Sequence, residues 1–150
     1  MNISIGSDHA ALAEKTELIT FLESQGHVLT DAGTHDLKSS DYADYAAIVC
    51  KSVKVGSEER GILICGTGIG MSIAANRYTG IRAALCYTEE LAILSRLHND
   101  ANVICFGART QTISSMKSII VPWLETKFEG GRHEQRLKKI ESNSRGNHAE

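Results

Sequence analysis

Five short apolar runs, separated by longer segments with a helical pattern, constrain the fold of this chain more than any other feature. The apolar runs cover residues 2–6, 27–31, 61–65, 81–86 and 102–106. The helical patterns cover residues 10–25, 43–55, 69–78, 88–98, 110–126 and 133–143. This alternation is typical of a parallel sheet with helices on both faces. We therefore predict a doubly wound α/β fold, a Rossmann-like three-layer sandwich with a mostly parallel five-stranded sheet.

The length of the chain fits one such domain. Its 150 residues with 42% hydrophobic content suffice for a substantial buried core, so residues 1–150 are expected to form a single domain. Pro122 falls inside the fifth helical pattern and predicts a kink, or a helix start near Val121. The segment 141–150, rich in Ser, Asn, Gly and charge, is expected to be a flexible tail.

Charge and hydropathy narrow the classes of partner. The net charge is -2, and Lys and Arg are scattered along most of the chain, so we expect no nucleic acid. No stretch approaches the ~18 apolar residues of a membrane helix. The first residues lack the basic segment and the apolar run of a signal peptide. These observations predict a cytoplasmic protein without a membrane partner.

The segment 61–76 carries the strongest chemical signal. An apolar strand ends in Cys65, and the chain then turns into a helix through three alternate glycines, Gly66, Gly68 and Gly70. A helix N-terminus carries unpaired N–H groups and a partial positive charge, so it can hold a phosphate or an oxyanion and favours the thiolate form of a nearby cysteine. The dinucleotide pattern G-x-G-x-x-G and the P-loop pattern are both absent. Either this turn is a generic anion cradle, or its glycines only permit a tight turn.

The other cysteines point to packing. Cys50, Cys86 and Cys105 lie within apolar patterns, and we interpret them as inert core thiols. No C-x-x-C pair or zinc-finger histidine spacing occurs, so no metal site and no cofactor are predicted.

Polar residues follow other predicted strands. Asp8 and His9 come after the first strand, and Arg109 follows the fifth. Because the carboxyl ends of parallel strands meet at one edge of a sheet, we expect these residues to lie near Cys65. Asp8 could instead cap the next helix.

Two further groups lie later in the chain. His98 and Asn99 close the fourth helical pattern, where a histidine could also be a helix cap stabilised by the helix dipole. Arg132 and Arg136 lie four apart, on one helical face just after two glycines. Paired guanidinium groups suit a phosphate, although a solvated helix face is the alternative.

Taken together, these motifs and Tyr42 closely resemble the ribose-5-phosphate isomerase B family, which includes the galactose-6-phosphate isomerase subunits. The resemblance runs from residue 2 to about residue 140. It implies an aldose–ketose isomerase of the non-oxidative pentose phosphate pathway, which interconverts ribose 5-phosphate and ribulose 5-phosphate through an enediolate. Six-carbon 6-phosphates would be weaker substrates.

The resemblance also implies a role for each motif. Cys65 would accept the substrate proton, and His98 would be the acid that assists ring opening. The enediolate oxygens would be held by Thr67 and by the N–H groups of Gly66, Thr67, Gly68, Ile69 and Gly70. Asp8 and Asn99 would bind sugar hydroxyls. The remaining substrate-binding residues are Tyr42 and, around the phosphate, His9, Arg109, Arg132 and Arg136.

Finally, the resemblance implies a homodimer with shared active sites, with a dimer of dimers as an option. We expect the cysteine loop and Asp8 to come from one subunit, and His98, Asn99 and Arg109 to come from the other, which gives two equal sites. Two other functions remain open. One is a phosphosugar-binding module without catalysis, and the other is a thiol-dependent hydrolase or redox protein that uses Cys65.

Overall fold

A single five-stranded sheet forms the centre of the computed structural model, which describes residues 1–146. Its strands are β1 (Asn2–Ser7), β2 (Val28–Asp31), β3 (Arg60–Cys65), β4 (Ala83–Leu85) and β5 (Val103–Gly107). All neighbouring strands pair in parallel, in the order β2-β1-β3-β5-β4. The predicted doubly wound α/β fold is confirmed.

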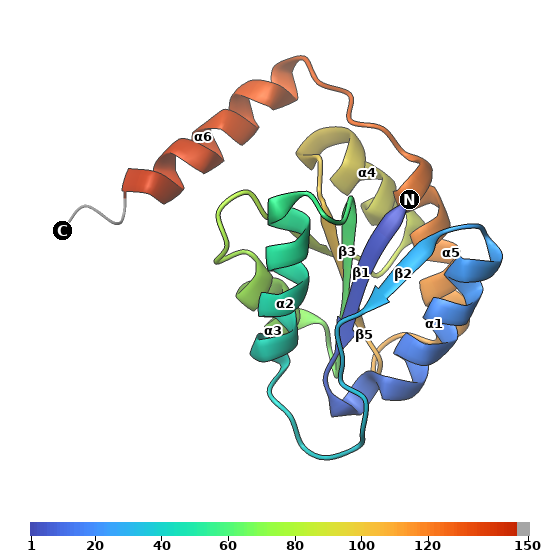
Figure 1. Cartoon of the computed structure of the whole chain (residues 1–150). Helices are drawn as coiled ribbons and strands as arrows, with labels where there is room; N and C mark the ends of the chain where they lie inside the picture. Colours follow the sequence, from blue (N-terminus) through green and yellow to red (C-terminus); the bar gives the residue numbers. More distant parts are fainter. Residues whose placement is uncertain (147–150) are drawn as a thin grey trace.

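Helices cover both faces of this sheet (Figure 1). Helices α1 (Leu12–Ser24), α4 (Glu89–Asn99) and α5 (Ile113–Glu125) pack on one face, and α2 (Tyr42–Val55) and α3 (Ile69–Ala75) pack on the other. A short 3-10 helix, η1 (His9–Ala11), precedes α1. The last helix, α6 (Arg132–Gly146), contacts α4 and extends away from the three layers (Figure 1).

Strand β3 shows why the sheet needs two helical layers. Its side chains alternate between the faces, so Ile62 and Ile64 join the core under α1 and α5, whereas Leu63 and Cys65 join the core under α2 and α3. A strand that is buried on both faces reads as a continuous apolar run, which is the pattern seen in the sequence. No helix among residues 1–146 is long and apolar enough to cross a membrane.

Two expected boundaries need correction. Helix α5 starts at Ile113, not near Val121, and it continues past Pro122 to Glu125. The Thr112 side chain accepts a hydrogen bond from the Ser115 N–H and fixes that start, and burial of the last turn keeps the helix intact beyond the proline. Helix α6 includes residues 141–146, which the composition assigned to the tail. Residues 147–150 of that tail lie outside the described residues.

Candidate active site

The carboxyl ends of β1, β3 and β5 bring three predicted residues together. The Asp8 N–H donates to the Ile64 carbonyl at 3.3 Å, beside Cys65 at the end of β3. The Arg109 N–H donates to the Gly66 carbonyl at 2.9 Å. Asp8, Cys65 and Arg109 therefore lie at one edge of the sheet, as predicted.

The Cys65 thiol is held against the turn that follows it. Its Sγ accepts a hydrogen bond from the Gly68 N–H at 3.2 Å, and the residue is only 4% exposed. Gly68 has φ 77°, and a Cβ at this position would lie 2.9 Å from the Phe106 backbone, so only glycine fits. This hydrogen bond fixes the position of the sulfur at the start of α3.

The other three cysteines lack this arrangement. Burial raises the pKa of Cys50 to about 12 and the pKa of Cys86 to about 11. Burial also raises the pKa of Cys105 well above its usual value. All three thiols are buried and stay protonated near neutral pH, which agrees with their interpretation as inert core residues.

Only part of the predicted anion cradle is available to a ligand. The Gly68 N–H is used by Cys65, and the Ile69 N–H donates to the Thr67 hydroxyl at 3.3 Å. The Tyr87 hydroxyl, which the sequence analysis missed, donates to the Thr67 carbonyl at 2.8 Å and fixes the loop. The N–H groups of Thr67 and Gly70 have no acceptor among residues 1–146, so these two can receive an oxyanion.

Two glycines of the loop make room for larger neighbours. A Cβ on Gly70 would lie 2.7 Å from the Tyr42 ring, and a Cβ on Gly66 would lie 3.2 Å from Arg109 Nη1. Tyr42 and Arg109 therefore pack against the cysteine loop of their own chain. This corrects the expectation that Arg109 comes from a partner subunit.

His9 is oriented by a neighbouring loop. Buried Lys15 pairs with Asp31 and donates to the Thr34 carbonyl at 2.7 Å, which anchors the segment between β2 and α2. From that segment, the Ser40 N–H donates to His9 Nδ1 at 3.1 Å. When Nδ1 accepts, the proton of a neutral imidazole lies on Nε2, which can donate to a ligand. Ser40 carried no recognisable signal in the sequence.

Asp8 caps the start of η1, as its position after the first strand allowed. Its Oδ1 accepts from the Ala10 N–H at 3.0 Å at the start of η1. Its Oδ2 has no hydrogen-bond partner among the described residues, and the side chain lies beside the cysteine loop. Capping by one oxygen leaves the other for a ligand hydroxyl.

His98 and Asn99 lie at the opposite edge. They end α4, and the Arg82 Nε donates to the Asn99 carbonyl at 3.0 Å just before β4 begins. This is the edge where the parallel strands start. Arg132 and Arg136, in the first turns of α6, lie beyond the end of α4 at this edge. Within one chain, the structure does not bring these residues to Cys65.

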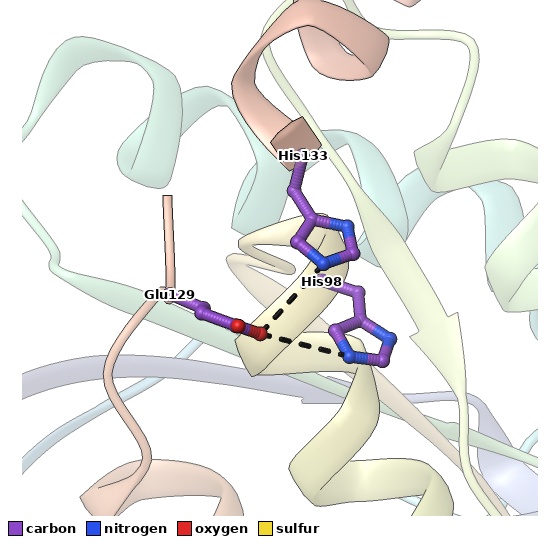
Figure 2. A group of neighbouring side chains, drawn as sticks. All are labelled: His98, Glu129 and His133. Carbon is purple, nitrogen blue, oxygen red and sulfur yellow. Dashed lines mark ion pairs between the residues drawn. The ribbon is translucent and has the colours of Figure 1, made fainter. Parts of the chain in front are cut away.

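His98 belongs to a cluster that the sequence analysis missed in part (Figure 2). Its ring stacks on His133, with centroids 4.3 Å apart and planes 10° apart. Glu129 Oε2 faces both rings, 3.8 Å from His98 Nε2 and 3.7 Å from His133 Nε2. Burial lowers the pKa of His133, nearby His98 lowers it further, and Glu129 opposes the shift. His133 was visible between Arg132 and Arg136, whereas Glu129 had no signal.

The same three residues are the candidate metal ligands among residues 1–146. One ligand atom from each of His98, Glu129 and His133 lies within 4.8 Å of the others. A histidine binds a metal in the plane of its ring, and an ion in the plane of one stacked ring would lie far out of the plane of the other. A metal would require one ring to leave the stack.

Comparisons with known proteins identify the family of this chain. The family model described as Ribose/Galactose Isomerase matches residues 3–140. Ribose-5-phosphate isomerase B of Escherichia coli (strain K12) is 44% identical over 138 residues, which cover 92% of this chain and 93% of that protein.

Solved structures give the same result. Clostridium thermocellum ribose-5-phosphate isomerase B matches with a TM-score of 0.97 at 44% identity, over 98% of this chain and 99% of that chain. The Mycoplasma genitalium ribose-5-phosphate isomerase B with bound ribulose-5-phosphate matches with a TM-score of 0.92 at 40% identity, over 96% of this chain and 96% of that chain. This chain therefore belongs to the ribose/galactose isomerase family.

Proposed function

We propose that this chain is an aldose–ketose isomerase that interconverts ribose 5-phosphate and ribulose 5-phosphate through an enediolate. The observation that carries the proposal is the Cys65 thiol, held by the Gly68 N–H beside two N–H groups that lack an acceptor in the described part of the chain. A family relative with bound ribulose-5-phosphate supports the substrate class. The reaction belongs to the non-oxidative pentose phosphate pathway, and we place the enzyme in the cytoplasm, where its phosphorylated substrate is retained.

Proton transfer follows from the chemistry of the loop. The Cys65 thiolate removes the proton from C2 of the open-chain aldose, and the electrons move onto the C1 carbonyl oxygen to form the enediolate. The N–H groups of Thr67 and Gly70 stabilise that negative charge. The Cys65 thiol then returns a proton to C1, the proton of the 2-hydroxyl passes to O1, and the ketose carbonyl forms at C2.

Ring opening and phosphate binding use the other residues. His98 donates a proton to the ring oxygen of the cyclic sugar, and Asp8 and Asn99 bind sugar hydroxyls. His9 presents Nε2–H to the phosphate beside Arg109, because its Nδ1 already accepts from Ser40. Arg132 and Arg136 add two more guanidinium groups, which form charge-assisted hydrogen bonds with phosphate oxygens. No step requires a cofactor.

The position of these groups supports a homodimer. Cys65 and His98 lie at opposite edges of one sheet, so one chain alone does not complete the site. A twofold axis that sets the Cys65 edge of one chain against the His98 edge of the other completes two identical sites. Two such dimers could then associate as a dimer of dimers. Arg109 belongs to the Cys65 side of each site.

Conversion of ribose 5-phosphate by the purified protein tests the proposal. Cys65→Ala should lose turnover by about 10²-fold or more, as for a positioned base, while ribose 5-phosphate still binds. Cys50→Ala is the matched control, because Cys50 lies on the buried face of α2 and its replacement should leave turnover unchanged. Binding of ribose 5-phosphate by the unmodified protein without any turnover would instead identify a phosphosugar-binding module.

The pentose assignment has its own test. The base and the phosphate site are fixed by the scaffold, so a sixth carbon displaces C2 from Cys65, and about 1 Å of displacement costs on the order of 10²-fold. Ribose 5-phosphate should therefore have a higher kcat/KM than allose 6-phosphate. The reverse order would reject the pentose preference and leave the isomerase mechanism in place.

A further inference from the structure

A second cavity lies at the amino edge of the sheet, away from Cys65. Its volume is about 580 Å³, which is within the usual range for small-molecule sites. It is formed between the end of α1, the start of β3 and the segment after α5, and its apolar wall includes Leu22, Val121, Leu124 and Phe128. None of the residues assigned above to the isomerase site lines it.

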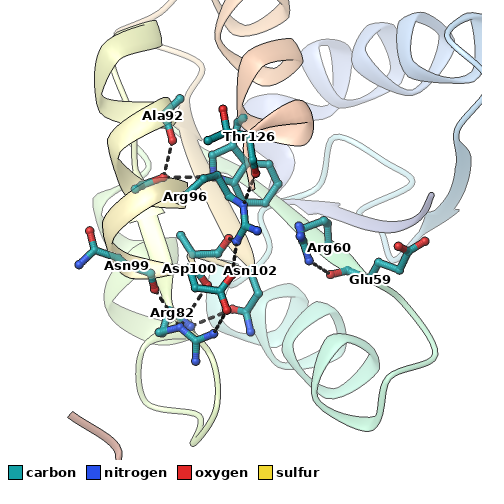
Figure 3. A network of polar contacts seen from close by, with 12 residues as sticks. Glu59, Arg60, Arg82, Ala92, Arg96, Asn99, Asp100, Asn102 and Thr126 are labelled. Atoms are coloured by element: carbon teal, nitrogen blue, oxygen red, sulfur yellow. Dashed lines mark hydrogen bonds and ion pairs between the residues drawn. The ribbon is translucent and has the colours of Figure 1, made fainter. Parts of the chain in front are cut away.

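One of the two arginines in this cavity is fully paired. Arg96 Nη1 donates to Asp100 Oδ1 and to the Ala101 carbonyl, both at 2.7 Å (Figure 3). Its guanidinium also lies 5.9 Å from the centre of the Trp123 ring. The positive charge of Arg96 is therefore neutralised by Asp100. Arg96 lines the cavity with a side chain that these contacts hold in place.

The other arginine, Arg60, is not paired with a carboxylate among the described residues. Its Nη1 donates to the Glu59 carbonyl at 2.7 Å (Figure 3). The Glu59 carboxylate accepts from the Asn2 N–H at 3.1 Å. Arg60 Nε is buried and has no acceptor among residues 1–146. Burial lowers the pKa of Arg60, and nearby Arg96 lowers it further. A half-buried cation with a buried, unpartnered N–H gains from a nearby anion.

His27 adds a second unpartnered atom to the same cavity. Its Nδ1 is buried without a hydrogen-bond partner among the described residues. His27 lies just before β2 and Arg60 starts β3, so the two residues line one cavity only in the folded chain. The exposed side chains of Glu125 and Lys127 also line the cavity and offset each other in net charge. Met1 lines the cavity too, and the charge of its α-amino group and that of the Glu59 carboxylate act on His27 with opposite signs. Once these charges offset each other, one excess positive charge remains, which we assign to Arg60.

We propose that this cavity binds a small monocarboxylate with a short apolar chain. A small turn of the Arg60 guanidinium presents Nε and Nη2 as two parallel donors, which match the two oxygens of a carboxylate. The apolar wall near Phe128 receives the hydrocarbon chain. A single negative charge fits because, after Glu59 offsets the Met1 α-amino group, Arg60 is the cation left without a carboxylate, and Glu125 opposes a second negative charge.

Hexanoate is the probe for this site, and the Arg60 Nε–H resonance in a ¹⁵N NMR spectrum is the readout. Ribose 5-phosphate is kept at saturation so that the isomerase site is filled. Hexanoate should shift the Arg60 Nε–H signal, and the neutral hexanamide should bind at least about tenfold more weakly, because it cannot form the charge-assisted pair.

Variants separate this site from general anion binding. Arg60→Gln should weaken hexanoate binding at least about tenfold, whereas the control Arg77→Gln, on the exposed turn after α3, should not. Glu125→Gln should tighten binding, a gain that misfolding cannot produce. Absence of hexanoate binding at millimolar concentration, equal binding by the Arg60→Gln variant, or equal binding of hexanamide would overturn the proposal.

Discussion

Gly107 at the end of β5 controls the position of the cysteine loop, and Gly107→Ala tests that control. A Cβ at this position would lie 2.6 Å from the backbone carbon and oxygen of Thr67 and would overlap the Thr110 hydroxyl. The contact with Thr67 must lengthen to at least 3.0 Å, or to 3.4 Å for ordinary van der Waals contact. The loop therefore moves by about 0.4 to 0.8 Å. At roughly 100-fold for each 1 Å of displacement, kcat should fall about 6- to 40-fold.

Gly61→Ala is the matched control for this prediction. Gly61 lies at the other end of β3, and its added Cβ would meet only the side chains of Val49, Val103 and Val53, at 2.7, 3.0 and 3.3 Å. Both variants should lose about 1 to 3 kcal/mol of stability through overpacking. Only Gly107→Ala should lower kcat at a temperature where both variants are folded by circular dichroism. Unchanged kcat in folded Gly107→Ala, or an equal loss in Gly61→Ala, would refute the argument.

Three further predictions concern the opposite edge. His98→Asn should slow conversion of cyclic substrate more than conversion of an open-chain analogue, and equal losses would exclude a role in ring opening. Arg132→Ala and Arg136→Ala should each raise KM for the phosphorylated sugar, because each guanidinium contributes about 1.5 to 3 kcal/mol to a bound phosphate, and a neutral sugar should be unaffected. The pKa of His133 is lowered from 6.5 on folding, so its contribution to stability is complete above pH 6.5 and falls as the pH drops below that value. Denaturant titrations should show a weaker loss of stability below pH 6.5 in His133→Gln than in the unmodified chain, and an identical pH profile would contradict this assignment.

Local patterns were sufficient to predict the fold. Each strand and helix has its own apolar period, and the parallel connections then fix which strand ends share an edge. Asp8, Cys65 and Arg109 could be placed together for this reason. The start of α5 was harder to predict, because Pro122 looked like a boundary while the Thr112 cap set the actual start.

Contacts between distant segments could not be predicted in the same way. The Tyr87 hydroxyl reaches Thr67 across 20 residues of sequence, and Ser40 reaches His9 across 31. Such pairs depend on side-chain directions that no local period specifies. The separation of His98 from Cys65 within one chain likewise follows from the direction of α4, not from the motif itself.

Complementation between two inactive variants tests the shared site most directly. One variant carries Cys65→Ala, the other carries His98→Asn with Arg132→Ala, and the two are coexpressed and purified together. If each site takes Cys65 from one chain and His98 from the other, a mixed dimer holds one fully intact site. Random pairing should then restore about a quarter of the unmodified activity, because half of the dimers are mixed and half of their sites are intact. If both groups acted from the same chain, every site would carry a lesion, and the absence of any recovery in verified mixed dimers would contradict the account.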